Sequence, residues 1–180
     1  MAISLANTGT ELLFSADSHV MEPVDLWTNG VPLSMRDSAP SFPPHKVGEG
    51  FQSQAGGWDP HERQKEMARD NVSAEVLYPT LGLGLFALDD PKMQVACFQV
   101  YNDWIAEYCA VAPERLLGVA MIATHDINTA VSELERSSKA GLRGALVWQT
   151  PRPDLPFKSA HYDPLWEAAQ ALVIFEIGAP

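Results

Sequence analysis

The sequence has few cysteines, no long apolar run and no excess of basic residues, and each absence excludes a class of protein. No stretch approaches the roughly 18 apolar residues of a transmembrane helix. The first residues, MAISLANTGTELLF, lack the basic and long apolar regions of a secretion signal. Cys97 and Cys109 both fall inside a helical pattern. We therefore expect a cytoplasmic protein with buried free thiols and no disulfide.

The charge balance limits the partners. A formal net charge of −11 argues against nucleic acid or an anionic membrane surface as a binding partner. A small anionic substrate is still compatible with this charge, because a bound metal ion reverses the local field. The length of 180 residues suits a single domain over 1–180, or a piece of a larger one.

Short apolar runs alternate with helical patterns along the chain. The runs of strand length cover 12–16, 74–80, 116–122, 144–148 and 172–177, and the helical patterns cover 60–71, 91–110, 127–140 and 163–171. Three helix starts are predicted, because a capping carboxylate precedes each one: Asp59-Pro60 with Glu62, Asp89 or Asp90 with Pro91, and Asp126. The segment 21–58 is rich in Pro, Gly and Ser, and we expect it to form one long loop.

This alternation predicts an α/β protein with a parallel sheet, because each crossover is long enough to return the chain parallel to the previous strand. Two architectures remain open. One is an open, doubly wound sheet. The other is the first five strands of a (β/α)₈ barrel, which would be incomplete at its C-terminal side.

The first apolar run ends in a candidate metal-binding pair. In an extended chain, residues two apart point to the same side, so Asp17 and His19 are expected to project together from a strand end. Carboxylate and imidazole both suit zinc or manganese. The alternative is an ordinary turn, in which Asp and Ser are common. Glu22 is a candidate further ligand, a residue that orients a ligand, or a solvated loop residue.

Two other residues are candidates for the wall of a pocket. His125 follows the strand predicted at 116–122, and Trp148 closes the strand predicted at 144–148. Both are expected at the carboxyl ends of parallel strands, where ligands gather. The alternative for His125 is an exposed position ahead of a helix, and for Trp148 it is ordinary packing.

An ordered series of segments resembles the amidohydrolase-related family, in the branch of aminocarboxymuconate-semialdehyde and resorcylate decarboxylases. The segments are SADSHVMEPVDLW, DPHERQKEMARDNVSAEVLYPTLGL, YNDWIAEYCAVAPERLLGVAMI, ELERSSKAGLRGALV and YDPLWEAAQAL. The resemblance implies a metal-dependent (β/α)₈ barrel that decarboxylates or hydrolyses small, often aromatic, carboxylic acids. It also implies that Asp17 and His19 bind a divalent metal, with zinc as the expected ion and manganese as the alternative.

The sequence departs from the family pattern in two ways. Glu176 stands where the family has a metal-ligand histidine after the fifth strand, so Glu176 is a candidate ligand or a residue that orients one. The sequence given ends at Pro180, before the later strands that supply the remaining family ligands. The N-terminal half of a barrel is therefore expected, with at most part of the metal shell.

Two functions follow from these observations. The first is a metal-dependent hydrolase or carboxy-lyase for a small aromatic carboxylic acid. The alternative is a catalytically inactive fragment that folds as an open α/β sheet and only binds a ligand or partner. If the chain is complete, its open sheet edges predict a homo-oligomer.

Overall fold

The computed structural model describes residues 12–42, 54–151, 153–172 and 175–178. These contain five parallel strands, β1 Leu13–His19, β2 Val72–Tyr78, β3 Leu116–Met121, β4 Gly144–Val147 and β5 Phe175–Gly178. The α-helices are α1 Leu26–Gly30, α3 Pro60–Arg69, α4 Pro91–Ala110, α5 Ile127–Lys139 and α6 Asp163–Leu172. Short 3₁₀ helices cover Leu33–Ser38, Ala55–Gly57, Gly82–Ala87 and Ala160–Tyr162.

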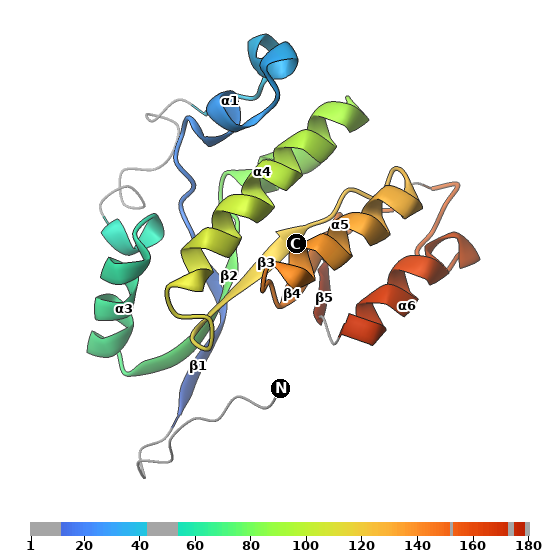
Figure 1. Ribbon diagram of the computed structural model, residues 1–180. Helices are drawn as coiled ribbons and strands as arrows, with labels where there is room; N and C mark the ends of the chain where they lie inside the picture. Colours follow the sequence, from blue (N-terminus) through green and yellow to red (C-terminus); the bar gives the residue numbers. More distant parts are fainter. Residues whose placement is uncertain (1–11, 43–53, 152, 173–174, 179–180) are drawn as a thin grey trace.

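The strand order decides between the two predicted architectures. The order in the sheet is β1-β2-β3-β4-β5, the same as in the sequence. A doubly wound sheet reverses its order at a switch point, whereas a (β/α)₈ barrel adds each strand beside the previous one. Helices α3, α4, α5 and α6 lie together on one side of the sheet (Figure 1). The prediction of a partial (β/α)₈ barrel is confirmed.

The predicted helix starts are confirmed by their capping hydrogen bonds. Asp59 accepts from the backbone N–H of His61 at 2.8 Å, and Asp126 accepts from that of Thr129 at 2.7 Å. Asp90 caps α4 in the same way. Just past α3, Asn71 has a φ of 56°, the left-handed conformation that lets the chain turn directly into β2.

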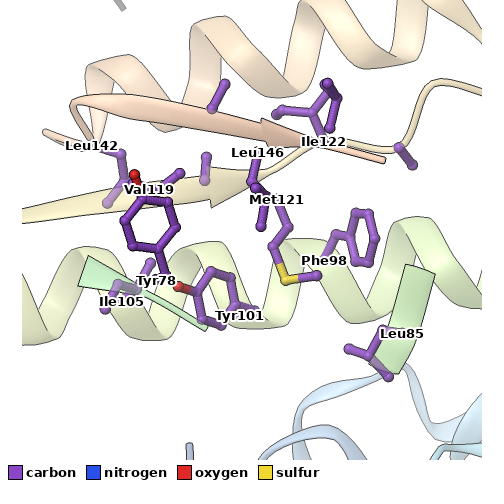
Figure 2. Close-up of a cluster of buried hydrophobic side chains, with 14 of the residues drawn as sticks. Tyr78, Leu85, Phe98, Tyr101, Ile105, Val119, Met121, Ile122, Leu142 and Leu146 are labelled. Atoms are coloured by element: carbon purple, nitrogen blue, oxygen red, sulfur yellow. The ribbon is translucent and has the colours of Figure 1, made fainter. Parts of the chain in front are cut away.

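Helix α4 forms the centre of the core. It packs against β3, and its buried side includes Phe98, Tyr101 and Ile105, which Figure 2 shows beside residues of β3 and β4. Gly118 permits this close packing. A Cβ atom there would lie 2.9 Å from the Cys109 sulfur and 3.1 Å from a side-chain carbon of Ile105.

The segment 21–58 is not one long loop, and that prediction was wrong. Its described part contains α1 and two 3₁₀ helices. Trp27 is fully buried, and its indole N–H donates to the carbonyl oxygen of Cys97 on α4 at 3.1 Å. This aromatic anchor gives α1 a tertiary partner that composition does not reveal. Residues 43–53 of the predicted loop lie outside the described residues.

None of the described helices is long and apolar enough to cross a membrane.

Candidate active site

Asp17 and His19 project together from the carboxyl end of β1, as the alternation of an extended chain predicts. The His19 Nε2 atom lies 3.6 Å from Asp17 Oδ1. The Asp17 side chain is 87% exposed and the His19 side chain 39% exposed. Two bonds of about 2.1 Å at a tetrahedral metal would place such atoms about 3.4 Å apart. The pair is therefore spaced to chelate one ion.

The pair lies next to Tyr78 of β2. His19 is opposite Tyr78 in the pairing of β1 with β2, and the rings of these two residues lie 5.8 Å apart. Burial, together with the negative charge of Asp17, raises the pKa of the Tyr78 hydroxyl.

A backbone carbonyl fixes the hydrogen positions on the His19 ring. His19 Nδ1 lies 2.8 Å from the carbonyl oxygen of Pro79. A carbonyl oxygen only accepts hydrogen bonds, so Nδ1 carries the hydrogen. In the neutral ring, Nε2 then keeps its lone pair and faces Asp17. This is the second hydrogen bond by which metal-binding histidines are commonly oriented.

Glu22 lies in the interior and its carboxylate holds the turn that follows β2. The residue is only 1% exposed, so the interpretation as a solvated loop residue was wrong. Its oxygens accept from the backbone N–H groups of Leu81 at 2.9 Å, Gly82 at 3.0 Å and Thr80 at 3.2 Å. Burial raises the pKa of Glu22, and these hydrogen bonds partly offset the effect. This arrangement occupies both oxygens and favours a structural role over metal binding.

Arg63 also holds the end of β1, and sequence reasoning missed it. Its guanidinium donates to the carbonyl oxygen of His19 at 2.8 Å and pairs with Glu75. Arg63 is only 9% exposed. A signal was present, because Arg63 and Met67 are four residues apart on the buried side of α3.

The end of β1 borders an acidic cavity of about 380 Å³. Asp17 and His19 line it, together with Arg63 and three further carboxylates. The carboxylates are those of Asp17, Glu66, Asp70 and Glu75. One of the four is neutralised by Arg63. The remaining negative charge favours a cation in this cavity.

His125 and Trp148 line a second, smaller pocket at the carboxyl ends of β3 and β4. The volume of this pocket is about 120 Å³. His125 Nε2 lies 2.9 Å from the side-chain oxygen of Gln94, and the indole of Trp148 stacks on Phe86 at 5.4 Å. Sequence reasoning also missed Gln94. A signal was present, because residues three apart lie on the same side of a helix, and Gln94 is a polar residue three positions before the apolar-side residue Cys97 of α4.

Glu176 lies on β5, with its backbone opposite Ala145 of β4. Its side chain is outside what the structure describes, so its role stays a prediction. Within the described ranges, no group of three or more His, Cys, Asp or Glu side chains is placed to hold a metal ion. The described part of the site is thus a two-residue pair.

A model of the amidohydrolase family matches residues 17–175. The chain belongs to this family. The match begins at Asp17, the first residue of the candidate metal pair, and ends at Phe175, the first residue of β5.

Individual proteins are also similar to this chain in sequence or fold. A γ-resorcylate decarboxylase from Polaromonas sp. is 42% identical over 77 residues, which cover 39% of this chain and 24% of that protein. A 2,6-dihydroxybenzoate decarboxylase from Rhizobium has the same fold, with a TM-score of 0.65 and 22% identity over 95% of this chain.

A dihydroxybenzoic acid decarboxylase from Polaromonas sp. JS666, solved with manganese and the inhibitor 2-nitroresorcinol, matches with a TM-score of 0.63. It is 23% identical over 95% of this chain. The chain spans about half the length of these solved structures, since the matches cover 50% of each.

Proposed function

We propose that this chain supplies the first two metal ligands of a metal-dependent decarboxylase or hydrolase that acts on a small aromatic carboxylic acid. The observation that carries the proposal is the Asp17–His19 pair, with His19 Nε2 3.6 Å from Asp17 Oδ1 and His19 Nδ1 engaged by the Pro79 carbonyl. The names of the relatives, which act on resorcylate and dihydroxybenzoate, support a hydroxylated benzoate as the substrate.

The proposed ion is divalent. Asp17 Oδ1 and His19 Nε2 are donors that suit manganese and zinc alike. Manganese has the additional support of the Polaromonas structure, which contains it. When bound, such an ion polarises a substrate oxygen or a bound water molecule.

The residues of this chain would orient the ligands. The Pro79 carbonyl engages Nδ1 of His19, which would leave Nε2 of the neutral ring available to an ion. Arg63 holds the backbone of His19, and Glu22 holds the turn that presents Pro79. The acidic cavity beside the pair would attract the cation before it binds. Two protein ligands are fewer than a catalytic zinc site uses, so water and further side chains, with Glu176 a candidate, complete the proposed shell.

The direct test is a titration of the purified chain with Mn²⁺. Binding is measured as the loss of the free Mn²⁺ signal in electron paramagnetic resonance. We expect about one tightly bound ion per chain. Removal of one of two protein ligands in Asp17→Asn or His19→Gln should weaken binding at least tenfold. The matched controls Asp25→Asn and His161→Gln lie away from the pair and should bind like the wild type.

A spin-echo measurement adds a second readout, because a coordinated imidazole nitrogen modulates the manganese signal. We expect this modulation in the wild type and its loss in His19→Gln. Equal binding by the wild type and both pair variants would contradict the proposal.

A further inference from the structure

The pocket at the carboxyl ends of β3 and β4 has features that suit one kind of ligand. We infer that it binds a hydroxylated aromatic ring, whose hydroxyl group donates a hydrogen bond to Nδ1 of His125. The pocket is lined by His125 and Gln94, with aromatic walls from Phe86, Trp148, Phe157 and Tyr162. The inference builds on the proposed function, because the ring would be that of the aromatic acid.

The hydrogen bonds of Gln94 determine which nitrogen of His125 is free. The Gln94 side-chain nitrogen donates to the carbonyl oxygens of Leu85 at 3.1 Å and Phe86 at 3.2 Å. The Gln94 oxygen therefore faces His125 Nε2, 2.9 Å away, and can only accept. His125 Nε2 must carry the hydrogen of this bond.

The other ring nitrogen is consequently a hydrogen-bond acceptor when His125 is neutral. Nδ1 has no hydrogen-bond partner among the residues that the structure describes. Gln94 is only 4% exposed, so its amide is held in a buried setting and keeps the imidazole oriented. An acceptor held in this way recognises a hydroxyl group and gives no hydrogen bond to an ether or a methyl group.

The walls and the volume of the pocket suit a single ring. The indole of Trp148 is stacked on Phe86 with an interplanar angle of 24°, and it is 38% exposed, so part of its surface is open to a ligand. Phe157 and Tyr162 meet edge to face at 5.1 Å on the same pocket. The pocket volume of about 120 Å³ is close to that of an apolar cavity of about 150 Å³ known to hold one benzene.

The pocket recognises the ring and not the carboxylate. No Lys or Arg is present among its described lining residues. A carboxylate placed there would lose its hydration without gaining a positive partner, which is costly. The described lining therefore suits the neutral ring with its hydroxyl.

The test compares phenol with anisole on the metal-free chain by two-dimensional NMR. The two probes share a ring, but only phenol can donate a hydrogen bond. We expect phenol to shift the signals of His125, Trp148 and Ile122, and to bind about three- to tenfold more tightly than anisole. Equal affinities, or shifts confined to other parts of the chain, would overturn the inference.

A variant pair sharpens the result. His125→Phe should keep an aromatic wall but bind phenol and anisole equally, whereas the exposed control His61→Phe should keep the preference for phenol. A preference for phenol that survives in a folded His125→Phe variant would also overturn the inference. The outcome is separate from that of the Mn²⁺ titration, because one experiment contains no metal and the other no phenol.

Discussion

At the scale of single residues, the surroundings of His19 are arranged to orient its ring. The Pro79 carbonyl fixes the ring hydrogen, and the neighbouring residues Thr80, Leu81 and Gly82 are held by Glu22. Gly82 is needed for this arrangement, because a Cβ there would lie 3.0 Å from a Glu22 oxygen and 2.9 Å from Pro79. One buried carboxylate thus organises the turn that presents the ligand-orienting carbonyl.

Replacement of Glu22 by Gln tests this role. The amide keeps the shape but points an NH₂ group at backbone N–H donors, so hydrogen bonds are lost in the interior. We expect Glu22→Gln to lower the free energy of unfolding by about 2 kcal/mol, measured by urea denaturation. The exposed control Glu107→Gln should change it by less than about 0.5 kcal/mol. Equal stability of both variants would show that Glu22 does not hold the turn.

At the scale of elements, a side chain of helix α4 forms hydrogen bonds with the backbone of β3 beyond the residues where β2 and β3 pair. The last paired residues are Leu77 and Gly118. Beyond them, the Asn102 side chain accepts from the Met121 N–H at 2.7 Å and donates to the Met121 carbonyl at 3.0 Å. The same amide donates to Glu133 of α5 at 2.7 Å, so one side chain links a strand and two helices.

Loss of the Asn102 amide should therefore be costly. Asn102→Ala leaves the backbone groups of Met121 and one oxygen of Glu133 without this buried partner. We expect a loss of about 3 kcal/mol in the free energy of unfolding, measured by denaturant titration. Gln99→Ala, an exposed amide on the same helix, is the control and should cost far less. A small effect of Asn102→Ala would mean that water replaces its hydrogen bonds.

Helix α4 also carries both thiols, and they predict a dependence of stability on pH. Burial raises the pKa of Cys97 to about 11 and that of Cys109 to about 12, from an ordinary value of 9.0. Thiols in the unfolded chain ionise first as pH rises, which favours unfolding. The stabilising contribution is thus complete below pH 9.0 and is lost as pH approaches the folded values.

Thermal unfolding between about pH 8 and 10 measures this effect. We expect the unfolding temperature of the wild type to fall with pH in this range. The fall should be shallower in the double variant Cys97→Ala/Cys109→Ala, because its thiols no longer titrate. Parallel pH profiles for the two proteins would disprove the assignment to these thiols.

At the scale of the whole molecule, β1 forms an edge of the described sheet. Among the described strands it pairs only with β2, and its apolar residues Leu13 and Phe14 are 51% and 48% exposed. An apolar edge with free backbone groups invites pairing with another chain. This supports the expectation of self-association for the chain as given.

Sedimentation velocity at increasing protein concentration tests this expectation. We expect concentration-dependent association of the wild type and a shift toward monomer in Phe14→Lys, because a charge on an edge strand opposes pairing. Leu33→Lys is the control, since Leu33 is 78% exposed but lies off the sheet. A wild type that stays monomeric at all concentrations would contradict the prediction.

Sequence alone was sufficient for the α/β alternation, the capped helix starts and the projection of Asp17 with His19, because these depend on local periodicity and on neighbours in the chain. The tertiary structure decided what distant segments do to one another. Strand order selected the partial barrel over the doubly wound sheet. Contacts between residues about sixty positions apart buried Glu22 and determined which nitrogen of the His19 ring donates to Pro79. No local pattern encodes such long-range contacts.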